Sequence, residues 1–255
     1  MEAPTADAFV AALHHARCPA ELPTIEKRLG PGDDAIGIRM RDLFDTAKAA
    51  MRTPLDEVES LFASPLYEVR MGAFCVLDFR AKAPRTDEAE RKRLYDLYLG
   101  HHDRITTWDM VDRAAPSVVG GYLIGRSCRP LHALAAVEDP LRRRTAVTAP
   151  LRFVRRGDEA DFAKVFSPAA VLVADPEPMV HKAVGIALKH AGARNPQALV
   201  EFLEKYAETM PRATLRAAVD KLDPHDRARS KQDTSSWAAA PWRSGLGLRH
   251  RRPRR

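Results

Sequence analysis

Two side chains four residues apart, Trp108 and Asp112, are the strongest candidates for chemistry in this sequence. Residues 105–112 are ITTWDMVD, in which Thr107 is a good N-cap and predicts a helix that starts at Trp108. Positions i and i+4 of a helix share one face, whereas Asp109 points about 100° away. An indole face attracts a cation by about 0.5–2 kcal/mol, and a fixed carboxylate stabilises positive charge that develops during bond cleavage. The pair therefore suits a cationic substrate.

Each of these residues also has a purely structural interpretation. Trp108 can be a core aromatic residue at a helix start, and Asp112 can be an ordinary solvated or salt-bridged acid. Asp109, in the first turn of the helix, is better explained as a complement to the helix dipole. The adjacent histidine pairs at 14–15 and 101–102 do not face each other on a helix, and the three cysteines are far apart. We therefore expect no metal site.

A second feature is a cluster of basic residues that follows this motif. Residues 141–157 contain six arginines and no acid. Four arginines are expected on or near one helical surface, as contacts along a phosphate backbone require: Arg144, Arg152, Arg155 and Arg156. A solvated helix face is the alternative interpretation. Residues 224–255 carry nine basic and two acidic residues, and the preceding 223 residues balance to zero, so nucleic-acid binding by the body must rest on clustering.

The elements that would position these side chains are helices. Good helix formers dominate, and apolar residues recur at three- and four-residue spacing in 43–51, 66–77 and 184–188. Prolines follow helix-capping residues at intervals of helix-pair size, in Thr53-Pro54, Ser64-Pro65, Asp139-Pro140, Asp175-Pro176 and Asn195-Pro196. The sequence predicts an all-α fold, an α-solenoid of HEAT-like antiparallel helix pairs. A compact helical bundle is the alternative.

The helical pattern ends near Asp223. We expect a helical-repeat domain over residues 1–223 and a disordered basic tail over residues 224–255. Residues 30–39, GPGDDAIGIR, are expected to form a loop that lacks the Gly-Lys-Ser/Thr of a phosphate-binding loop. The sequence has no run of 18 apolar residues and no signal-peptide pattern, so we expect a cytoplasmic protein without a membrane partner.

The segment around Trp108 resembles the signature of a known family. The string WDMVDRAAPSVVG at 108–120 is similar to the motif of the DNA alkylation repair family, the AlkD-like HEAT-repeat DNA glycosylases. Three further segments carry the resemblance, namely LYEVR at 66–70, RRTAV at 143–147 and KAVG at 182–185. The resemblance covers residues 35–222 and does not extend into the tail.

The resemblance implies a DNA glycosylase that releases N3- or N7-alkylated purines from duplex DNA, without metal or cofactor. It places the catalytic residues at Trp108, Asp112 and Arg144, with Arg144 able to clamp a flanking phosphate. It also implies that the helical repeats curve around DNA with a basic concave groove. The expected DNA-binding residues are Arg143, Arg152, Arg155, Arg156 and Lys182. Where the family usually has a second aromatic residue, this chain has Ile186.

Two other classes of function remain open at the level of sequence. One is a noncatalytic HEAT-repeat protein that binds damaged or structured DNA, which Ile186 favours. The other is a protein-binding helical repeat in which Trp108 is buried and the arginines are solvated. Trp108, Asp112 and Arg144 favour the glycosylase. We expect it to act as a monomer, associated with the nucleoid if the source is a bacterium.

Overall fold

The computed structural model describes residues 4–30 and 32–222, so the expected tail at 224–255 lies outside the described residues. In that part of the chain every regular element is a helix, and the only pairing of strand type is two isolated bridges, Arg17–Ile38 and Asp34–Leu66. The prediction of an all-α fold is confirmed. The α-helices in these residues are α1 (Ala6–His15), α2 (Leu22–Glu26), α3 (Met40–Ala49), α4 (Leu55–Ser60), α5 (Tyr67–Lys82), α6 (Glu88–Gly100), α7 (Trp108–Ala115), α8 (Gly121–Leu123), α9 (Arg129–Ala135), α10 (Pro140–Thr148), α11 (Leu151–Arg156), α12 (Glu159–Ala163), α13 (Phe166–Val171), α14 (Pro178–Arg194), α15 (Pro196–Tyr206) and α16 (Arg212–Ala218).

Short helical turns of other kinds extend or connect these helices. One π-helix, η4 (Pro116–Gly120), continues α7 directly into α8. The 3₁₀ turns are η1 (Pro19–Glu21), η2 (Leu61–Ala63), η3 (His102–Arg104), η5 (Ala207–Thr209) and η6 (Val219–Lys221). Within residues 4–30 and 32–222, no helix combines the length and the apolar character needed to cross a bilayer.

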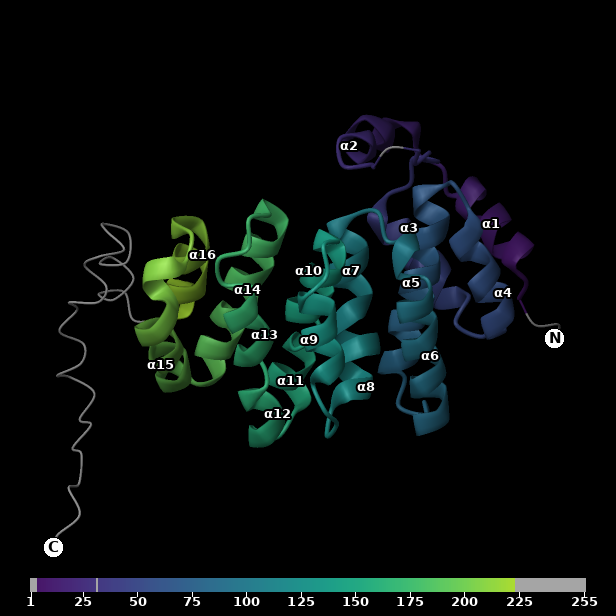
Figure 1. Ribbon diagram of the computed structural model, residues 1–255. Coiled ribbons are helices and arrows are strands. Elements are labelled where there is room, and N and C mark those ends of the chain that lie inside the picture. The colour runs from purple at the N-terminus through teal and green to yellow at the C-terminus, as the bar shows by residue number, and fades with distance from the viewer. Residues whose placement is uncertain (1–3, 31, 223–255) are drawn as a thin grey trace, which may run out of the picture.

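The helices stack side by side in an elongated row, with the N-terminal helices at one end and α15 and α16 at the other (Figure 1). A central series runs through this row, in which each helix packs against the next: α3, α5, α7, α10, α14 and α16. Helices α6, α9 and α15 pack beside α5, α10 and α14 respectively. The predicted solenoid-like arrangement is confirmed, and the compact bundle is not found.

The cap-and-proline pattern identified some helix starts correctly and others only approximately. Asp139 caps α10 by accepting a hydrogen bond from the Leu141 amide, and Asn195 caps α15 in the same way. In both helices the proline is the first helical residue, where its missing N–H costs nothing. Pro65 instead precedes Leu66, the N-cap of α5. The capping pairs therefore mark helix starts to within about two residues.

The apolar core consists of two clusters that follow one another along the row. The first contains buried side chains from α1 to α9 together with Phe153 of α11 and Phe162 of α12. The second contains buried side chains of α10, α13, α14, α15 and α16. The two clusters meet in α9, where Leu131 belongs to the first and Leu134 to the second. Each part of the stack is thus stabilised mainly by its neighbours, as in repeat proteins.

The loop before α3 is fixed to the start of α5 by a buried carboxylate. Glu68 is completely buried, and its two carboxylate oxygens accept hydrogen bonds from the amides of Ile36 and Gly37, both at 2.9 Å. Asp33 and Arg70, also buried, form an ion pair at 2.5 Å. Residues 32–39 contain no helix, so the expected loop is found there. These bonds satisfy groups whose burial without partners would be costly.

One glycine permits a close approach between the π-helix and the helix pair α10–α11. A Cβ atom on Gly120 would lie 2.1 Å from the carbonyl oxygen of Ala149 and 2.9 Å from the Cβ of Arg152. The next residue, Gly121, faces open space, because no heavy atom lies within 4 Å of its Cβ position. Gly120 therefore sets how closely α7 and its extension pack against α10 and α11.

We expect Gly120→Ala to lower the free energy of unfolding by about 3 kcal/mol or more, because backbone atoms must move to admit the methyl group. The matched control is Gly121→Ala, which removes a helical glycine without a clash and should change stability by less than about 1 kcal/mol. Urea denaturation followed by circular dichroism measures both. Equal effects of the two substitutions would contradict the close approach.

Candidate active site

Trp108 is the first residue of α7 and is one of the few large apolar side chains exposed in the described chain, at 39%. The interpretation of Trp108 as a core aromatic residue is therefore wrong. Thr107 is the N-cap by position, but its hydroxyl makes no capping bond; it donates to Oδ1 of Asp109 at 2.5 Å. The indole is thus presented at the N-terminal end of a helix of the central series.

Asp112 lies one turn further along α7 and forms a bidentate ion pair with Arg144 of α10. Nε of Arg144 donates to Oδ1 at 2.9 Å, and Nη2 donates to Oδ2 at 2.7 Å. The remaining nitrogen, Nη1, donates to the carbonyl oxygen of Met179 in the first turn of α14. Arg144 is only 1% exposed, whereas the Asp112 side chain is 34% exposed. One guanidinium therefore joins three helices and holds a carboxylate that solvent can reach.

Two cations lie over the indole of Trp108. The guanidinium carbon of Arg144 is 5.5 Å from the ring centroid, and the ammonium of Lys182 in α14 is 5.6 Å from it. Lys182 is exposed, so it can leave the ring without breaking a buried contact. The structure thus brings together Trp108, Asp112, Arg144 and Lys182 from α7, α10 and α14, as the sequence predicted for the first three.

Asp109 faces away from Asp112, as its position in the helix predicted. Its carboxylate accepts a hydrogen bond from the Tyr67 hydroxyl at 2.8 Å and lies 3.4 Å from a guanidinium nitrogen of Arg28. Burial, and then the charge of Asp109, raises the pKa of Tyr67 above its usual value. Arg28 also stacks over the Tyr67 ring at 5.5 Å. Asp109 therefore fixes the start of α7 against α5 and the N-terminal loop.

Three polar side chains, Tyr98 of α6, His102 of η3 and Thr145 of α10, form a buried hydrogen-bonded group. The Thr145 hydroxyl is 3.0 Å from the Tyr98 hydroxyl and 2.9 Å from Nε2 of His102. His102 is completely buried. Burial, and then the charge of Arg142, lowers the pKa of His102 to about 4, although Asp139 opposes this. His102 is therefore neutral in the folded protein near neutral pH.

The arginines of residues 141–157 do not share one surface. Arg144 belongs to α10 and is buried, whereas Arg152, Arg155 and Arg156 belong to α11, beyond a turn at residues 149–150. The expectation of one surface is wrong because the helix it assumed is two helices. The bidentate pair with Asp112 also leaves Arg144 unsuited to the expected phosphate clamp.

Arg143 and the α11 arginines differ in how many of their side-chain nitrogens are bonded to other groups of the protein. Nε of Arg143 donates to Asp175 at 2.6 Å, and its side chain is only 11% exposed. Arg155 and Arg156 are exposed, and Arg152 is half-buried with no hydrogen-bond partner for Nε in the described part of the chain. Burial, and then the positive charge of Arg156, lowers the pKa of Arg152. Within the described residues no ion pair holds Arg152, Arg155 or Arg156, and Asp78 is the acid whose charge reaches Arg152, so the α11 cluster is a positive surface.

Comparison with known proteins places this chain in a family. A profile described as "DNA alkylation repair enzyme" matches residues 9–222, which is most of the chain. The chain belongs to the DNA alkylation repair enzyme family. Membership connects it with the repair of alkylated DNA. No curated protein matches the chain.

A solved structure described as "Predicted DNA alkylation repair enzyme from Enterococcus faecalis" is similar to this family member. The likeness covers 82% of this chain and 97% of that chain, with a TM-score of 0.62 and 15% sequence identity. At 15% identity the likeness supports the shared fold alone. The description of the site is therefore based on the side chains of this family member.

Ile186 lies one turn after Lys182 on α14, so the two share a helix face. Ile186 is half-buried. The neighbouring Gly185 packs α14 closely on α16, since a Cβ there would lie 2.8 Å from the Cβ of Ala217. In this family member the α14 side of the site therefore offers an ammonium and an aliphatic side chain.

Several residues of the site were not identified from the sequence. Arg28 and Tyr67 hold Asp109 from 81 and 42 positions away, and no spacing rule connects residues at such separations. The Met179 carbonyl carries no side-chain signal at all. No group of three or more histidine, cysteine or acidic side chains in residues 4–30 and 32–222 is placed to hold a metal ion.

The buried His102 makes stability depend on pH. Because its folded pKa of about 4 lies below the unfolded value of about 6.5, the unfolded state binds the proton first. Its stabilising effect is complete above about pH 6.5 and is lost as the pH falls toward 4. We expect a loss of about 2 kcal/mol between pH 7 and pH 5 from this residue.

Urea denaturation at a series of pH values tests this expectation. The difference between the wild type and His102→Gln should change with pH only below about pH 6.5, since the glutamine does not titrate. A pH-independent difference between them would contradict the lowered pKa.

Proposed function

We propose that this family member is a monofunctional, metal-independent DNA glycosylase that excises cationic N3- or N7-alkylated purines from duplex DNA. The observation that carries the proposal is an exposed indole, Trp108, one turn from a carboxylate, Asp112, that a buried guanidinium holds in a fixed orientation. Trp108 and Asp112 are the proposed catalytic residues, and Arg144 is the proposed positioning residue. Membership in an alkylation repair family supports the choice of alkylated DNA as substrate.

The indole of Trp108 supports recognition of a cationic base. Its face already attracts two cations in the free protein, Arg144 and Lys182. An alkylated purine carries a positive charge, so it can take the place of the Lys182 ammonium at a gain of about 0.5–2 kcal/mol relative to a neutral base. Lys182 then becomes available to bind a nearby phosphate.

The reaction needs a stabiliser of positive charge on the sugar. As the bond between C1′ and the purine nitrogen breaks, its electron pair neutralises the cationic base, and the deoxyribose acquires oxocarbenium character. The Asp112 carboxylate stabilises that charge and orients a water molecule toward C1′. The oxygen of this water bonds to C1′, and its proton passes to Asp112 or to solvent. The products are the free base and an abasic site.

Arg144 contributes to the reaction through Asp112. Two parallel N–H···O bonds fix both carboxylate oxygens, so the carboxylate needs little reorganisation when charge develops on the sugar. The bond from Arg144 to the Met179 carbonyl ties the same group to α14, which carries Lys182. The part of the site that binds the base and the part that stabilises the sugar are therefore held in one frame.

We expect Asp112→Asn to slow excision by about two orders of magnitude or more, because the negative charge is the stabilising element. Single-turnover release of N7-methylguanine from a duplex at saturating protein measures the rate, and binding to the same duplex should be retained. A rate equal to that of the wild type would remove the glycosylase proposal.

Asp109→Asn is the matched control, since it makes the same chemical change three positions away on another face of α7. It weakens the contacts with Tyr67 and Arg28, so it should lower the melting temperature. It should slow excision much less than Asp112→Asn does. Each rate is compared per folded molecule, because Asp112→Asn also weakens a buried ion pair.

The α11 arginines support contact with the DNA backbone. A duplex carries one phosphate charge per about 1.7 Å of its axis, so contacts can extend well beyond the base-binding site. Replacement of Arg152, Arg155 and Arg156 by alanine should weaken binding to all sequences and lower the slope of log K against log [salt] by about one for each phosphate that is no longer bound. The matched control replaces three arginines that are paired with acids elsewhere, Arg41, Arg80 and Arg126. An unchanged slope in the α11 variant would mean that the cluster is only a solvated surface.

Ile186 favours a second candidate function, a noncatalytic protein that binds damaged or structured DNA. An aliphatic side chain on the α14 side of the site gives a cationic base no second aromatic face. We expect Ile186→Trp to accelerate release of N7-methylguanine, with Ile186→Leu as the control for side-chain bulk. If neither the wild type nor Ile186→Trp releases the base while both bind the duplex, the noncatalytic function is the correct one.

A further inference from the structure

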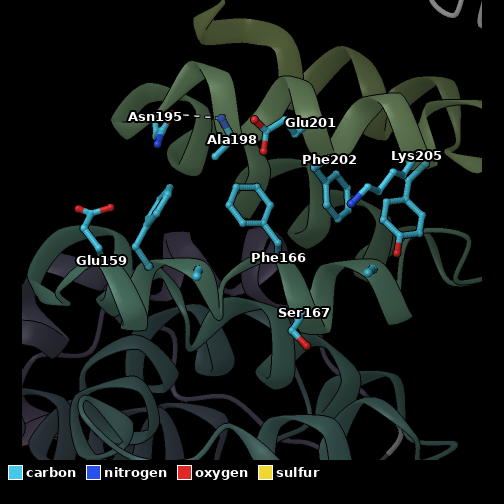
Figure 2. A pocket seen from close by; sticks show the side chains of 12 residues that line it. Glu159, Phe166, Ser167, Asn195, Ala198, Glu201, Phe202 and Lys205 are labelled. Carbon is cyan, nitrogen blue, oxygen red and sulfur yellow. Dashed lines mark hydrogen bonds between the residues drawn. The ribbon is translucent and has the colours of Figure 1, made fainter. Parts of the chain in front are cut away.

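An unassigned groove lies between α12–α13 and α15, far along the row from Trp108. Figure 2 shows the groove with Phe166 and Ser167 on one wall and Phe202 and Lys205 on the other. Its volume is about 580 Å³, within the range of pockets that bind organic groups. It is lined by Glu159, Phe162, Ala163, Phe166, Ser167, Ala170, Asn195, Ala198, Glu201, Phe202, Lys205 and Tyr206.

A continuous series of aromatic rings lines this groove. Phe162 and Phe166 meet edge to face at 5.7 Å, Phe166 and Phe202 lie 5.6 Å apart, and Phe202 and Tyr206 lie 4.7 Å apart. Phe166 and Tyr206 are only partly buried and line the groove, and Figure 2 shows the ring of Phe166 directed into it. Such a surface favours a flat apolar group, and above all another aromatic ring.

Two of the three tryptophans of the chain lie in the C-terminal segment, at Trp237 and Trp242. Around them the segment is mostly polar, small and basic, and its only other large apolar residues are Leu246 and Leu248. We propose that the groove binds the chain's own C-terminal segment, residues 223–255, through the indoles of Trp237 and Trp242.

The place where the described chain ends supports this occupant. The last described residue, Leu222, directly follows η6, and both η6 and α15 pack against α14. Trp237 is fifteen residues further on, which allows a span of up to about 50 Å. Tethering at this length gives the indoles an effective concentration of about 1 mM at the groove. The groove is therefore mostly occupied even if its affinity for an indole is low.

Charge also favours this segment over a neutral or acidic one. The residues that line the groove and carry a full charge at neutral pH are Glu159, Glu201 and Lys205, so the lining has a net negative charge. Glu159 pairs with Arg194 at 2.6 Å, whereas Glu201 is exposed and, among the described residues, accepts a bond only from the Gln197 amide at 3.1 Å. The segment from 224 to 255 has nine basic and two acidic residues. Its five arginines after residue 248 lie beyond the tryptophans and stay available for phosphate.

The test uses the full chain labelled with 5-fluorotryptophan, which gives one fluorine signal for each of the three tryptophans. Trp237→Phe and Trp242→Phe assign the signals, and the shift between H₂O and D₂O measures how far solvent reaches each fluorine. We expect the solvent shifts of the Trp237 and Trp242 signals to be about half or less of that of free 5-fluorotryptophan.

Glu201→Lys should restore the full solvent shift, because it places a positive charge in the groove. Glu204→Lys is the matched control, since Glu204 is exposed on the same helix but does not line the groove. Ala163→Arg, at an exposed lining position, is a second blocking variant that leaves the aromatic series intact. Circular dichroism checks that each variant is folded.

Three results would overturn the proposal. Full solvent shifts in the wild type would mean that the indoles are free. Protection that disappears on dilution would assign the groove to a second copy of the chain. Protection that persists in both Glu201→Lys and Ala163→Arg would place the indoles elsewhere on the molecule.

Discussion

The bidentate pair between Arg144 and Asp112 is the interaction on which the candidate site depends. Arg144 is almost completely buried, and an unpaired guanidinium at such a position would cost several kcal/mol. Its partners are a carboxylate on α7 and a backbone carbonyl on α14, so the charge is compensated only when three consecutive helices of the central series are in register. The same pair leaves Asp112 open to solvent on its outer side, where a substrate would meet it.

Asp109 and Asp112 lie three residues apart on α7, and their different surroundings give them different roles. Asp109 is enclosed by Tyr67, Thr107 and Arg28, and all its contacts lie within the protein. Asp112 has one buried partner and otherwise faces outward. The first therefore stabilises the start of the helix that presents Trp108, and the second is the one placed to act on a ligand.

The sequence predicted those parts of the molecule that depend on local patterns. Apolar spacing predicted helices, and the four-residue separation correctly placed Trp108 and Asp112 on one face of α7. The resemblance assigned Arg144 to the same site as Asp112, but the ion pair between them was not predicted, because no local rule relates residues 32 positions apart.

The arginine cluster is where local patterns were misleading. The sequence from 141 to 157 looked continuous, but the chain turns at 149–150. That turn places Arg144 on α10 and the other expected members of the surface on α11. Whether an arginine is free or bonded, as Arg143 is to Asp175, depends on tertiary contacts that composition does not encode.

The division of the core into two clusters has a consequence for how the protein would lose its site. Asp112 belongs to a helix packed in the first cluster, whereas Met179 and Lys182 belong to a helix packed largely in the second. In stacked repeats the end units open more easily than the whole chain unfolds. An excursion in which α14 to α16 detach would remove the carbonyl partner of Arg144 and the cation over Trp108 while the N-terminal helices stay folded. The same local opening would then govern both the rate of amide hydrogen exchange in α16 and the fraction of molecules in which the site at Trp108 and Asp112 is complete.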